Sequence, residues 1–479
     1  MIRSRFKKGM DPKALKLSSS LNHDVSIFEY DILTNVAHTL TLLNSSYLNR
    51  EEAKEIIEAL SKIRKAGFRE IEDYEDVEEM IEAEVTKITA AGKKMHTGKS
   101  RNDEVATCLR MFARDALLKI ALKLCELRKS LLEVSETNLD VIMPGFTHLQ
   151  HAQPTKLSHH ILAYHEMIKR DYDRVIEVFK RVNLSPLGSA AFASTVYKLD
   201  RNYSANLLGF DGVVEHSEDG VASRDFLIES VFVCAQIMLD LSRICEEIII
   251  FSTSNFAYVD LPEEFASTSS IMPQKKNPDI AELIRANTGK VIGNLTGAMA
   301  IYKATPFSYN RDFQELNALL YDSLSRTELS CDVLASMIPK IVFNREKMRE
   351  DASKGFSFAT HLADYLVLKY SIPFRDAHKI VGKLVSDEIS ARKLKEVAKE
   401  FGYGIEMSEE ELEKLKDVEL IVESRKNIGG TAKDEIVRLI TKRKEELKLD
   451  IRRVEMLKER IEMKIAKLFE LVRDMEVEF

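Results

Sequence analysis

STSSIMPQKKNPD, residues 267–279, interrupts two long segments in which apolar residues recur at helical spacing. Its two prolines, Pro273 and Pro278, exclude a continuous helix across the stretch. The stretch offers hydroxyl, amide and ammonium groups as hydrogen-bond donors, and its only acid is Asp279. Because the whole chain carries a formal charge of -7, this local excess of donors indicates a binding site for an anion.

The segments around this stretch predict a bundle of long helices. Helical periodicity extends over residues 104–138, 158–182, 223–254 and 280–303. The 479 residues include 18 glycines and 10 prolines, and such low numbers favour helices over turn-rich sheets. With 45% hydrophobic residues, the chain can bury a large core. We therefore expect an all-α fold.

Breaks in this pattern divide the chain into three parts. We expect an N-terminal helical domain over residues 1–100, in which Asn49 resembles the cap of a helix. The long-helix bundle is expected to occupy residues 101–350. A C-terminal helical domain over residues 351–479 ends in an amphipathic run, 433–472, whose apolar spacing predicts one helix or a helix pair.

Composition disfavours several classes of protein. An isoelectric point near 6.0 gives no electrostatic reason to bind nucleic acid. The apolar runs are too short to span a membrane, and no apolar signal core follows the basic N-terminus, so we expect a cytoplasmic protein. The cysteines lack the spacing of a zinc site, and we expect free buried thiols at Cys108, Cys125, Cys234, Cys245 and Cys331.

Three polar strings carry residue types that suit chemistry on an anion. Ser100–Asn102 places the Arg101 guanidinium, which can bind a carboxylate through two hydrogen bonds, beside a hydroxyl and an amide. His148, which follows Thr147, is a side chain that exchanges protons near neutral pH. Taken singly, a lone histidine is more often structural, SRN is a common helix cap and adjacent lysines are usually solvated. Their joint occurrence with residues 267–279 suits a polyanionic substrate that gains negative charge during the reaction.

The order of these strings resembles that of a known family. STSSIMPQKKNP resembles the signature GSSxMPxKxNP of the fumarase/aspartase superfamily. Further strings are similar to counterparts in the argininosuccinate lyase family: HTGKSRNDEVAT, PGFTHLQHAQPT, SPLGSAAFAST, YNRDFQE and NIGGTA. The resemblance extends from about Ser20 to Thr431, and it implies reversible cleavage of argininosuccinate to arginine and fumarate without a metal or organic cofactor.

The resemblance also implies an oligomer. Members of this family are built from three mostly helical domains, and the central helices of four copies associate into a twenty-helix core. Each active site then combines segments from three subunits. Long amphipathic helices that a single chain cannot fully cover suit such a homotetramer.

The resemblance assigns a role to each matching residue. Ser269 is the base that removes a proton from the carbon beside a carboxylate, and Lys275 and Asn277 stabilise the resulting aci-carboxylate. His148 serves the other proton transfer with Glu282 as its charge-relay partner, and which of Ser269 and His148 donates or accepts stays open. The remaining matches bind substrate: Ser100, Arg101, Asn102 and Thr147 on the fumarate side, Ser20, Asp24, Tyr309 and Gln314 toward the arginine end, and Arg224 lining the site.

Some residues depart from the family pattern. Thr268 stands where the family has a glycine, while Glu78 replaces a histidine and Asn317 a lysine at the arginine end, which shifts that pocket toward negative charge. These changes leave open a lyase for another N-substituted aspartate, such as adenylosuccinate, or for aspartate itself. A catalytically silent, crystallin-like protein is disfavoured because His148 and Ser269 are both present.

Overall fold

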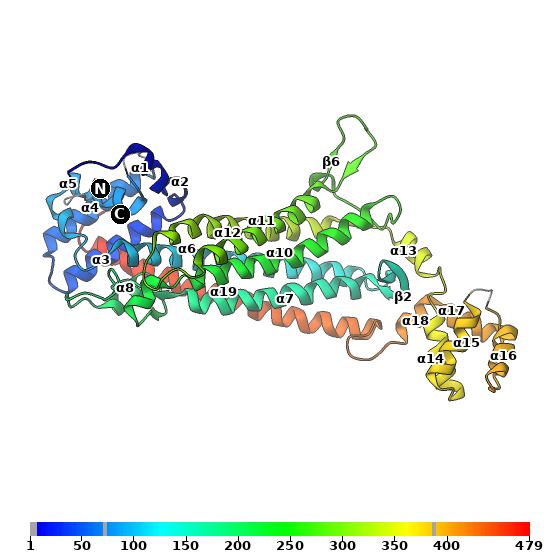
Figure 1. Cartoon of the computed structure of the whole chain (residues 1–479). Helices are drawn as coiled ribbons and strands as arrows, with labels where there is room; N and C mark the ends of the chain where they lie inside the picture. The colour runs from blue at the N-terminus through cyan, green and yellow to red at the C-terminus, as the bar shows by residue number, and fades with distance from the viewer. Residues whose placement is uncertain (1–6, 70–73, 386–388) are drawn as a thin grey trace.

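The longest helices form a bundle at the centre of the molecule, with a smaller helical lobe at each end (Figure 1). The computed structural model describes residues 7–69, 74–385 and 389–479. Helices predominate throughout these ranges, which confirms the predicted all-α fold. The bundle helices are α6 (Arg101–Thr137), α7 (Leu157–Val182), α10 (Asp225–Ser252), α11 (Asp279–Tyr302), α12 (Gln314–Met337) and α19 (Lys433–Arg473).

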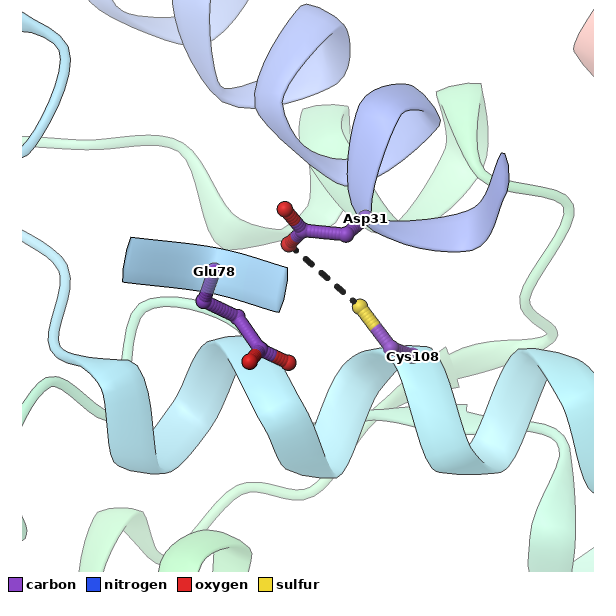
Figure 2. Close-up of side chains that lie close together, drawn as sticks. All are labelled: Asp31, Glu78 and Cys108. Carbon is purple, nitrogen blue, oxygen red and sulfur yellow. Dashed lines mark hydrogen bonds between the residues drawn. The ribbon is translucent and has the colours of Figure 1, made fainter. Parts of the chain in front are cut away.

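The short helices of the N-terminal lobe cover the start of α6. Asn49 caps α4 in a capping box with Glu52, as predicted. Deeper in the lobe, Asp31 of α3 and Glu78 of α5 meet Cys108 of α6 in a buried cluster (Figure 2). The elements of this lobe are α1 (Pro12–Ser18), α2 (Leu21–Asp24), α3 (Phe28–Asn44), α4 (Arg50–Ala66), α5 (Val77–Ile88) and the 3-10 helix η1 (Ala90–Lys94).

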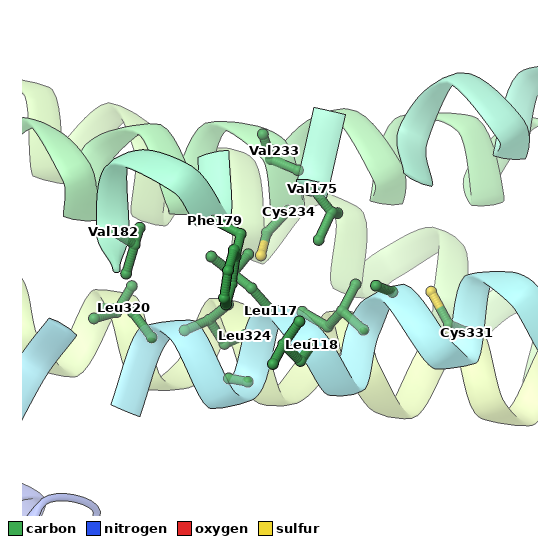
Figure 3. Close-up of a cluster of buried hydrophobic side chains, with 14 of the residues drawn as sticks. Leu117, Leu118, Val175, Phe179, Val182, Val233, Cys234, Leu320, Leu324 and Cys331 are labelled. Atoms are coloured by element: carbon green, nitrogen blue, oxygen red, sulfur yellow. The ribbon is translucent and has the colours of Figure 1, made fainter. Parts of the chain in front are cut away.

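Apolar side chains from four helices fill the centre of the bundle. α6 packs against α7 and α12, and α10 packs against α7, α11 and α12. Figure 3 shows Leu117 of α6, Phe179 of α7, Cys234 of α10 and Leu324 of α12 in one buried cluster. All five cysteines are free and buried, as predicted. The predicted helices match α6, α7, α10 and α11, whereas α12 was not predicted.

A capping box starts α6. The Ser100 hydroxyl accepts the backbone N–H of Asn102 at 3.3 Å, and the Asp103 carboxylate accepts the Ser100 N–H at 2.8 Å. These bonds satisfy backbone donors that a first helical turn leaves unpaired. The helix continues from this cap for 37 residues. At the usual helical rise its two ends lie about 55 Å apart.

A separate apolar core holds the C-terminal lobe together. Its buried side chains include Leu366, Ile380 and Leu394. The helix α13 (Arg345–Ala352) leads from the bundle into this lobe. The helices of the lobe are α14 (Ala359–Tyr370), α15 (Phe374–Leu384), α16 (Ala391–Glu400), α17 (Glu409–Lys416) and α18 (Val418–Glu423).

The last helix, α19, returns to the bundle and runs beside it (Figure 1). It is one continuous helix of 41 residues that packs along α6. The buried Arg128 of α6 donates to the Asp450 carboxylate of α19 at 2.8 Å, and the Tyr172 hydroxyl of α7 donates to the Asp450 carbonyl at 2.9 Å. The amphipathic run is therefore a single helix that shares the core of the bundle. The division of the chain into three domains stays a prediction.

Short strands interrupt the helices. β1 (Ile142–Thr147) and β2 (Gln150–Lys156) form an antiparallel hairpin just after α6. β6 (Ser267–Thr268) and β7 (Lys276–Asn277) form a second hairpin, which projects from the bundle (Figure 1). Both segments were predicted as polar breaks and not as strands. The other short elements are β3 (Leu184–Ser185), β4 (Gly212–Val213), β5 (Val259–Asp260), β8 (Val342–Phe343), α8 (Arg201–Leu207), α9 (Ser217–Ala222), η2 (Glu263–Phe265), η3 (Arg311–Phe313) and η4 (Ile338–Lys340).

Membrane spans were not expected from the hydropathy of the chain. Within the three described ranges, no helix combines the length and the apolar character that crossing a membrane requires. The longest helices, α6 and α19, instead carry many charged residues.

Candidate active site

A pocket opens where the N-terminal lobe meets the start of the bundle. Its cavity volume is about 240 Å³. Segments that are far apart in the sequence line it, so folding assembles a site that no single motif contains. The predicted residues that line this pocket are Ser20, Asp24, Arg101, Asn102, Arg224, Tyr309 and Gln314.

Asp24 forms part of an acidic side of the pocket. The Ser20 hydroxyl donates to Asp24 Oδ2 at 2.7 Å, and the Val77 N–H donates to the same oxygen at 3.2 Å. Burial raises the pKa of Asp24 to about 7, and the nearby Asp76 carboxylate acts in the same direction. The bonds from Ser20 and Val77 oppose this rise because they stabilise the ionised form. Asp24 therefore changes charge near neutral pH.

Arg101 and Arg224, two of the three arginines that line the pocket, differ in their partners. Arg101 Nη1 lies 2.9 Å from Asp76 Oδ2 and 3.6 Å from Glu75 Oε2, so this guanidinium is already paired with acids of the chain. Arg224 is 1% exposed, and its Nη1 donates to two backbone carbonyls at 3.1 Å. In the described part of the chain, Arg224 Nε and Nη2 have no hydrogen-bond partner. This free edge of a buried guanidinium is suited to bind a carboxylate.

Asp103 holds a loop against the start of α6. Its Oδ2 accepts the backbone N–H of Gly188 at 2.9 Å and that of Ala190 at 2.8 Å. Its other carboxylate oxygen accepts the N–H of Ser100. One carboxylate therefore links the predicted break at residues 185–195 to the pocket. Sequence reasoning did not assign this role to Asp103, although an acid three residues after a serine is the signal of a capping box.

His148 lies at the exposed tip of the β1–β2 hairpin. Thr147 and Gln150 pair across a two-residue turn formed by His148 and Leu149. The φ angle is 57° at both turn residues, a backbone conformation that favours glycine or asparagine. The turn therefore holds His148 in a strained backbone state, and such states are frequent at functional sites.

Ser269 lies on the projecting β6–β7 hairpin. Its Oγ accepts the backbone N–H of Ile271 at 3.3 Å and that of Met272 at 3.0 Å. On the same hairpin Lys275 is exposed and Asn277 is half-buried. The predicted anion-binding groups are therefore close together in the chain and reachable from solvent.

The helices α10 and α11 carry the chain away from the pocket and back again. Arg224 directly precedes α10, which has 28 residues and runs along the bundle to the end where the β6–β7 hairpin projects (Figure 1). Ser269 lies on that hairpin, and Glu282 lies in the first turn of α11, which follows it. A helix of this length spans about 42 Å. A single chain therefore does not bring Ser269 to the pocket.

The β1–β2 hairpin lies at the same far end of the bundle. Phe146 of β1 packs against Phe251 near the end of α10, with ring centroids 6.2 Å apart. Glu282 is exposed, and Arg285 Nη2 lies 3.7 Å from its Oε1. Among the residues that the structure describes, no hydrogen bond joins His148 to Glu282. The proton-transfer roles of both residues stay predictions.

Comparison with known proteins identifies the family. The family model described as Lyase matches residues 4–293, and the one described as Argininosuccinate lyase C-terminal matches residues 356–428. Argininosuccinate lyase from Archaeoglobus fulgidus is 64% identical, over 93% of this chain and 92% of its own. Argininosuccinate lyase from Methanococcoides burtonii is 44% identical, again over 93% and 92%. The chain belongs to the argininosuccinate lyase family.

Solved structures agree with membership of the argininosuccinate lyase family. EDDS lyase in complex with formate has a TM-score of 0.87 at 29% identity, covering 98% of this chain and 96% of its own. A variant of EDDS lyase with bound fumarate has the same TM-score at 28% identity, covering 99% and 97%. Class II fumarase from Schistosoma mansoni, at 16% identity and a TM-score of 0.69 over 87% and 92%, shares the fold. The resemblance read from the sequence is confirmed.

The pocket of this argininosuccinate lyase family member also contains residues that sequence reasoning did not assign. Asp76 caps α5 and pairs with Arg101. Arg311 Nη1 lies 3.7 Å from Glu75 Oε2, and its Nη2 donates to the carbonyl of Ser18 at 2.7 Å. Arg311 belongs to the YNRDFQE string, so its neighbourhood was recognisable from the sequence. Only the fold shows that these charges face one another.

Asp24→Asn should stabilise the fold at alkaline pH. Burial raises the pKa of Asp24 from 3.8 to about 7, so the folded state binds more protons than the unfolded state between these two pH values. The stability contributed by Asp24 is therefore complete below about pH 4, falls as pH rises and is lost above about 7. We expect the melting temperature of Asp24→Asn to exceed that of wild type clearly at pH 8 and much less at pH 5, by differential scanning calorimetry.

The exposed Asp140 provides the matched control. The Lys433 ammonium, which lies 2.8 Å from its carboxylate, lowers the pKa of Asp140. Asp140→Asn should therefore produce no gain in melting temperature at pH 8. An equal gain at both pH values in Asp24→Asn would contradict the raised pKa of Asp24.

Proposed function

We propose that this chain cleaves argininosuccinate to L-arginine and fumarate by elimination, and that it catalyses the reverse reaction. Relatives with the name argininosuccinate lyase match nearly its whole length, one of them at 64% identity. The observation that carries the proposal is the pocket, because residues assigned to substrate binding from four separate segments meet in it. The five cysteines of the chain are free and buried, which suits the reducing conditions of the cytoplasm.

The elimination breaks a C–N bond and forms a C=C bond. A base removes a proton from the carbon next to a carboxylate, and the electron pair of that C–H bond passes through an aci-carboxylate dianion into the double bond of fumarate. The C–N electron pair leaves with the guanidine nitrogen, which gains a proton to become the guanidinium of arginine. The enzyme must therefore hold a dianion and place two proton-transfer groups.

The hairpin geometry supports Ser269 as the base. A serine hydroxyl is ordinarily too weakly acidic to lose its proton at neutral pH. The N–H groups of Ile271 and Met272 donate to Ser269 Oγ, and such donors favour the ionised oxygen. On the same hairpin, Lys275 and Asn277 supply a cation and an amide that hold the aci-carboxylate.

His148 and Glu282 complete the proton transfers in this proposal. Both side chains are exposed at the far end of the bundle, where a second copy can approach them. A carboxylate beside an imidazole orients the ring and stabilises its charged form. Thr147 adjoins His148, and its hydroxyl can donate a hydrogen bond to a carboxylate of the fumarate half of the substrate.

The pocket binds the rest of the substrate. The start of α6 lies at the positive end of the helix dipole, and the side chains of Arg101 and Asn102 line the pocket there, which favours the carboxylates of the fumarate half. The free edge of Arg224 takes the carboxylate of the amino-acid half. Tyr309 and Gln314 lie in the same pocket and offer further polar contacts.

A complete site requires several copies of the chain. Along one chain, the bundle separates the pocket from both catalytic hairpins by about 40–55 Å. We therefore infer a homotetramer in which each site combines segments of three subunits. Contact between copies would also bury apolar side chains that are exposed on the bundle helices, including Phe232, Leu239, Leu283, Met299 and Leu329.

A lyase for another N-substituted aspartate, such as adenylosuccinate, is the second candidate. Glu78 and Asn317, the departures from the family pattern, both line the pocket that binds the amine half in this proposal. EDDS lyase has a structure closely similar to that of this chain, although its name indicates a different substrate. The reacting half of the site is the same for both candidates, so substrate choice depends on the amine half.

Purified protein mixed with argininosuccinate should release fumarate, which ultraviolet absorbance measures directly. Adenylosuccinate and aspartate are the comparison substrates and should release little or none, because their amine halves differ in shape and charge. Fumarate from adenylosuccinate in place of argininosuccinate would favour the second candidate. No fumarate from argininosuccinate would overturn the proposed function.

Ser269→Ala should lower kcat by about 10²–10⁴-fold, the range expected for loss of a general base. The oligomeric mass, measured by light scattering, should not change, because the side chain lies on an exposed hairpin. The control is Ser270→Ala, one residue further along the same hairpin, which should lower kcat far less. Near-normal turnover by Ser269→Ala would remove Ser269 from the role of base.

Two inactive variants should restore activity when they form mixed oligomers. His148→Asn disables the far-end hairpin and Gln314→Ala disables the pocket, so a mixed oligomer contains some sites in which both positions are intact. Refolding the two variants together should give activity well above the sum of the separate samples. Co-refolding His148→Asn with His148→Ala is the control and should give no gain. Equal behaviour of both mixtures would argue against sites shared between subunits.

A further inference from the structure

Two buried hydrogen-bond acceptors in the pocket have no donor. Glu78 is 4% exposed and Asn317 is 6% exposed, and both line the pocket. Neither Glu78 Oε1 nor Asn317 Oδ1 has a hydrogen-bond partner within residues 7–69, 74–385 and 389–479. Because an unsatisfied buried acceptor is unfavourable, a ligand that brings a donor to this place is favoured.

The charge around Glu78 favours a cationic donor. Burial raises the pKa of Glu78 well above its usual range, and four neighbouring carboxyl groups raise it further. These neighbours are Asp24, Asp31, Asp76 and Glu104. Glu104 is already paired with the buried Lys99, and Asp76 with Arg101. A cation placed beside Glu78 therefore acts mainly on Glu78 itself, whose ionised form it stabilises.

A metal ion is the rival occupant of this cluster. Ligand atoms of Asp31, Glu78 and Cys108 lie within 4.8 Å of one another (Figure 2). However, Cys108 Sγ donates to Asp31 Oδ1 at 3.7 Å, and burial raises the pKa of the Cys108 thiol well above its usual range. Metal ions bind the thiolate form of cysteine. An organic cation needs only the free oxygen of Glu78 and suits the cluster better.

The location of the reacting bond decides which end of the substrate reaches Glu78. In the proposed function, His148 and Ser269 come from other copies of the chain and meet the substrate where the pocket is open. The side chain of Arg101 is 35% exposed, whereas Glu78 and Asn317 are almost fully buried. The buried end of the pocket is therefore left for the part of the substrate farthest from the C–N bond, which is its amino-acid group.

We propose that Glu78 and Asn317 bind the ammonium group of the amino-acid half of the substrate. Their two free oxygens accept two of its N–H bonds, while the free edge of Arg224 in the same pocket binds the adjoining carboxylate. This assignment rests on the proposed function. It gives a role in substrate binding to the two positions that depart from the family pattern, both of which line the pocket.

Ligand binding without turnover tests this pair. Titration calorimetry on the intact enzyme compares L-arginine with 5-guanidinopentanoate, which lacks only the ammonium group. In wild type, loss of that group should weaken binding about tenfold to a hundredfold. Glu78→Gln should weaken L-arginine binding by a similar factor and leave 5-guanidinopentanoate binding unchanged, because the interaction is already absent there. Asn317→Leu should also weaken the binding of L-arginine and leave the binding of 5-guanidinopentanoate unchanged.

Glu84→Gln is the matched control. Glu84 lies on α5 with Glu78 but outside the pocket, where it accepts hydrogen bonds from Tyr74 and Lys87. This variant should bind both ligands like wild type. Equal losses for both ligands in Glu78→Gln, or no loss, would overturn the proposal. Tight Zn²⁺ binding that both Glu78→Gln and Cys108→Ser abolish would overturn it in favour of a metal site.

These outcomes are distinct from failure of the proposed function. If wild type cleaves argininosuccinate but binds the two ligands equally, the ammonium site is wrong and the function stands. If argininosuccinate releases no fumarate, the function is wrong, and the ratio of the two affinities still decides the ammonium site. Failure of wild type to bind L-arginine at all would overturn both.

Discussion

The rigidity of the long bundle helices is the constraint on which the rest of the structure depends. Hydrogen bonds within α6 keep its ends about 55 Å apart, so the capped start at Ser100 and the hairpin that carries His148 cannot meet in one chain. Contacts such as the pair between Arg128 and Asp450 hold the neighbouring helices to the same axis. The pocket and the two hairpins that carry the predicted proton-transfer residues therefore lie at opposite ends of one chain.

Much of the fold was predictable because its helices obey local rules. Periodic apolar residues and the cap at Asn49 predicted α4, α6, α7, α10 and α11 near their observed bounds. The helix α12 was missed although Leu316, Leu320 and Leu324 recur on one face. The return of α19 to the bundle was also missed. Apolar spacing predicts that one face of a helix is buried, but it does not show which other helices pack against that face.

The candidate site was predictable as a set of residues and not as an arrangement. The strings around Arg101 and Tyr309 supplied pocket residues, since a motif preserves the residue types that a chemistry needs. The bond from Asp103 to the loop at Gly188 was not predictable, because it joins positions 85 residues apart. The burial of Glu78 was likewise visible only when α3, α5 and α6 had been placed together.

The buried carboxyl groups around Asp24 and Glu78 have a consequence for the empty enzyme. Burial and neighbouring carboxyl groups make it unfavourable to ionise either side chain, and a bound cation offsets part of that free-energy cost. A ligand that binds only the folded state also raises the temperature at which the chain unfolds. The unfolding temperature therefore depends on the fraction of sites that are occupied, and the protein resists heat better when substrate is abundant than when it is scarce.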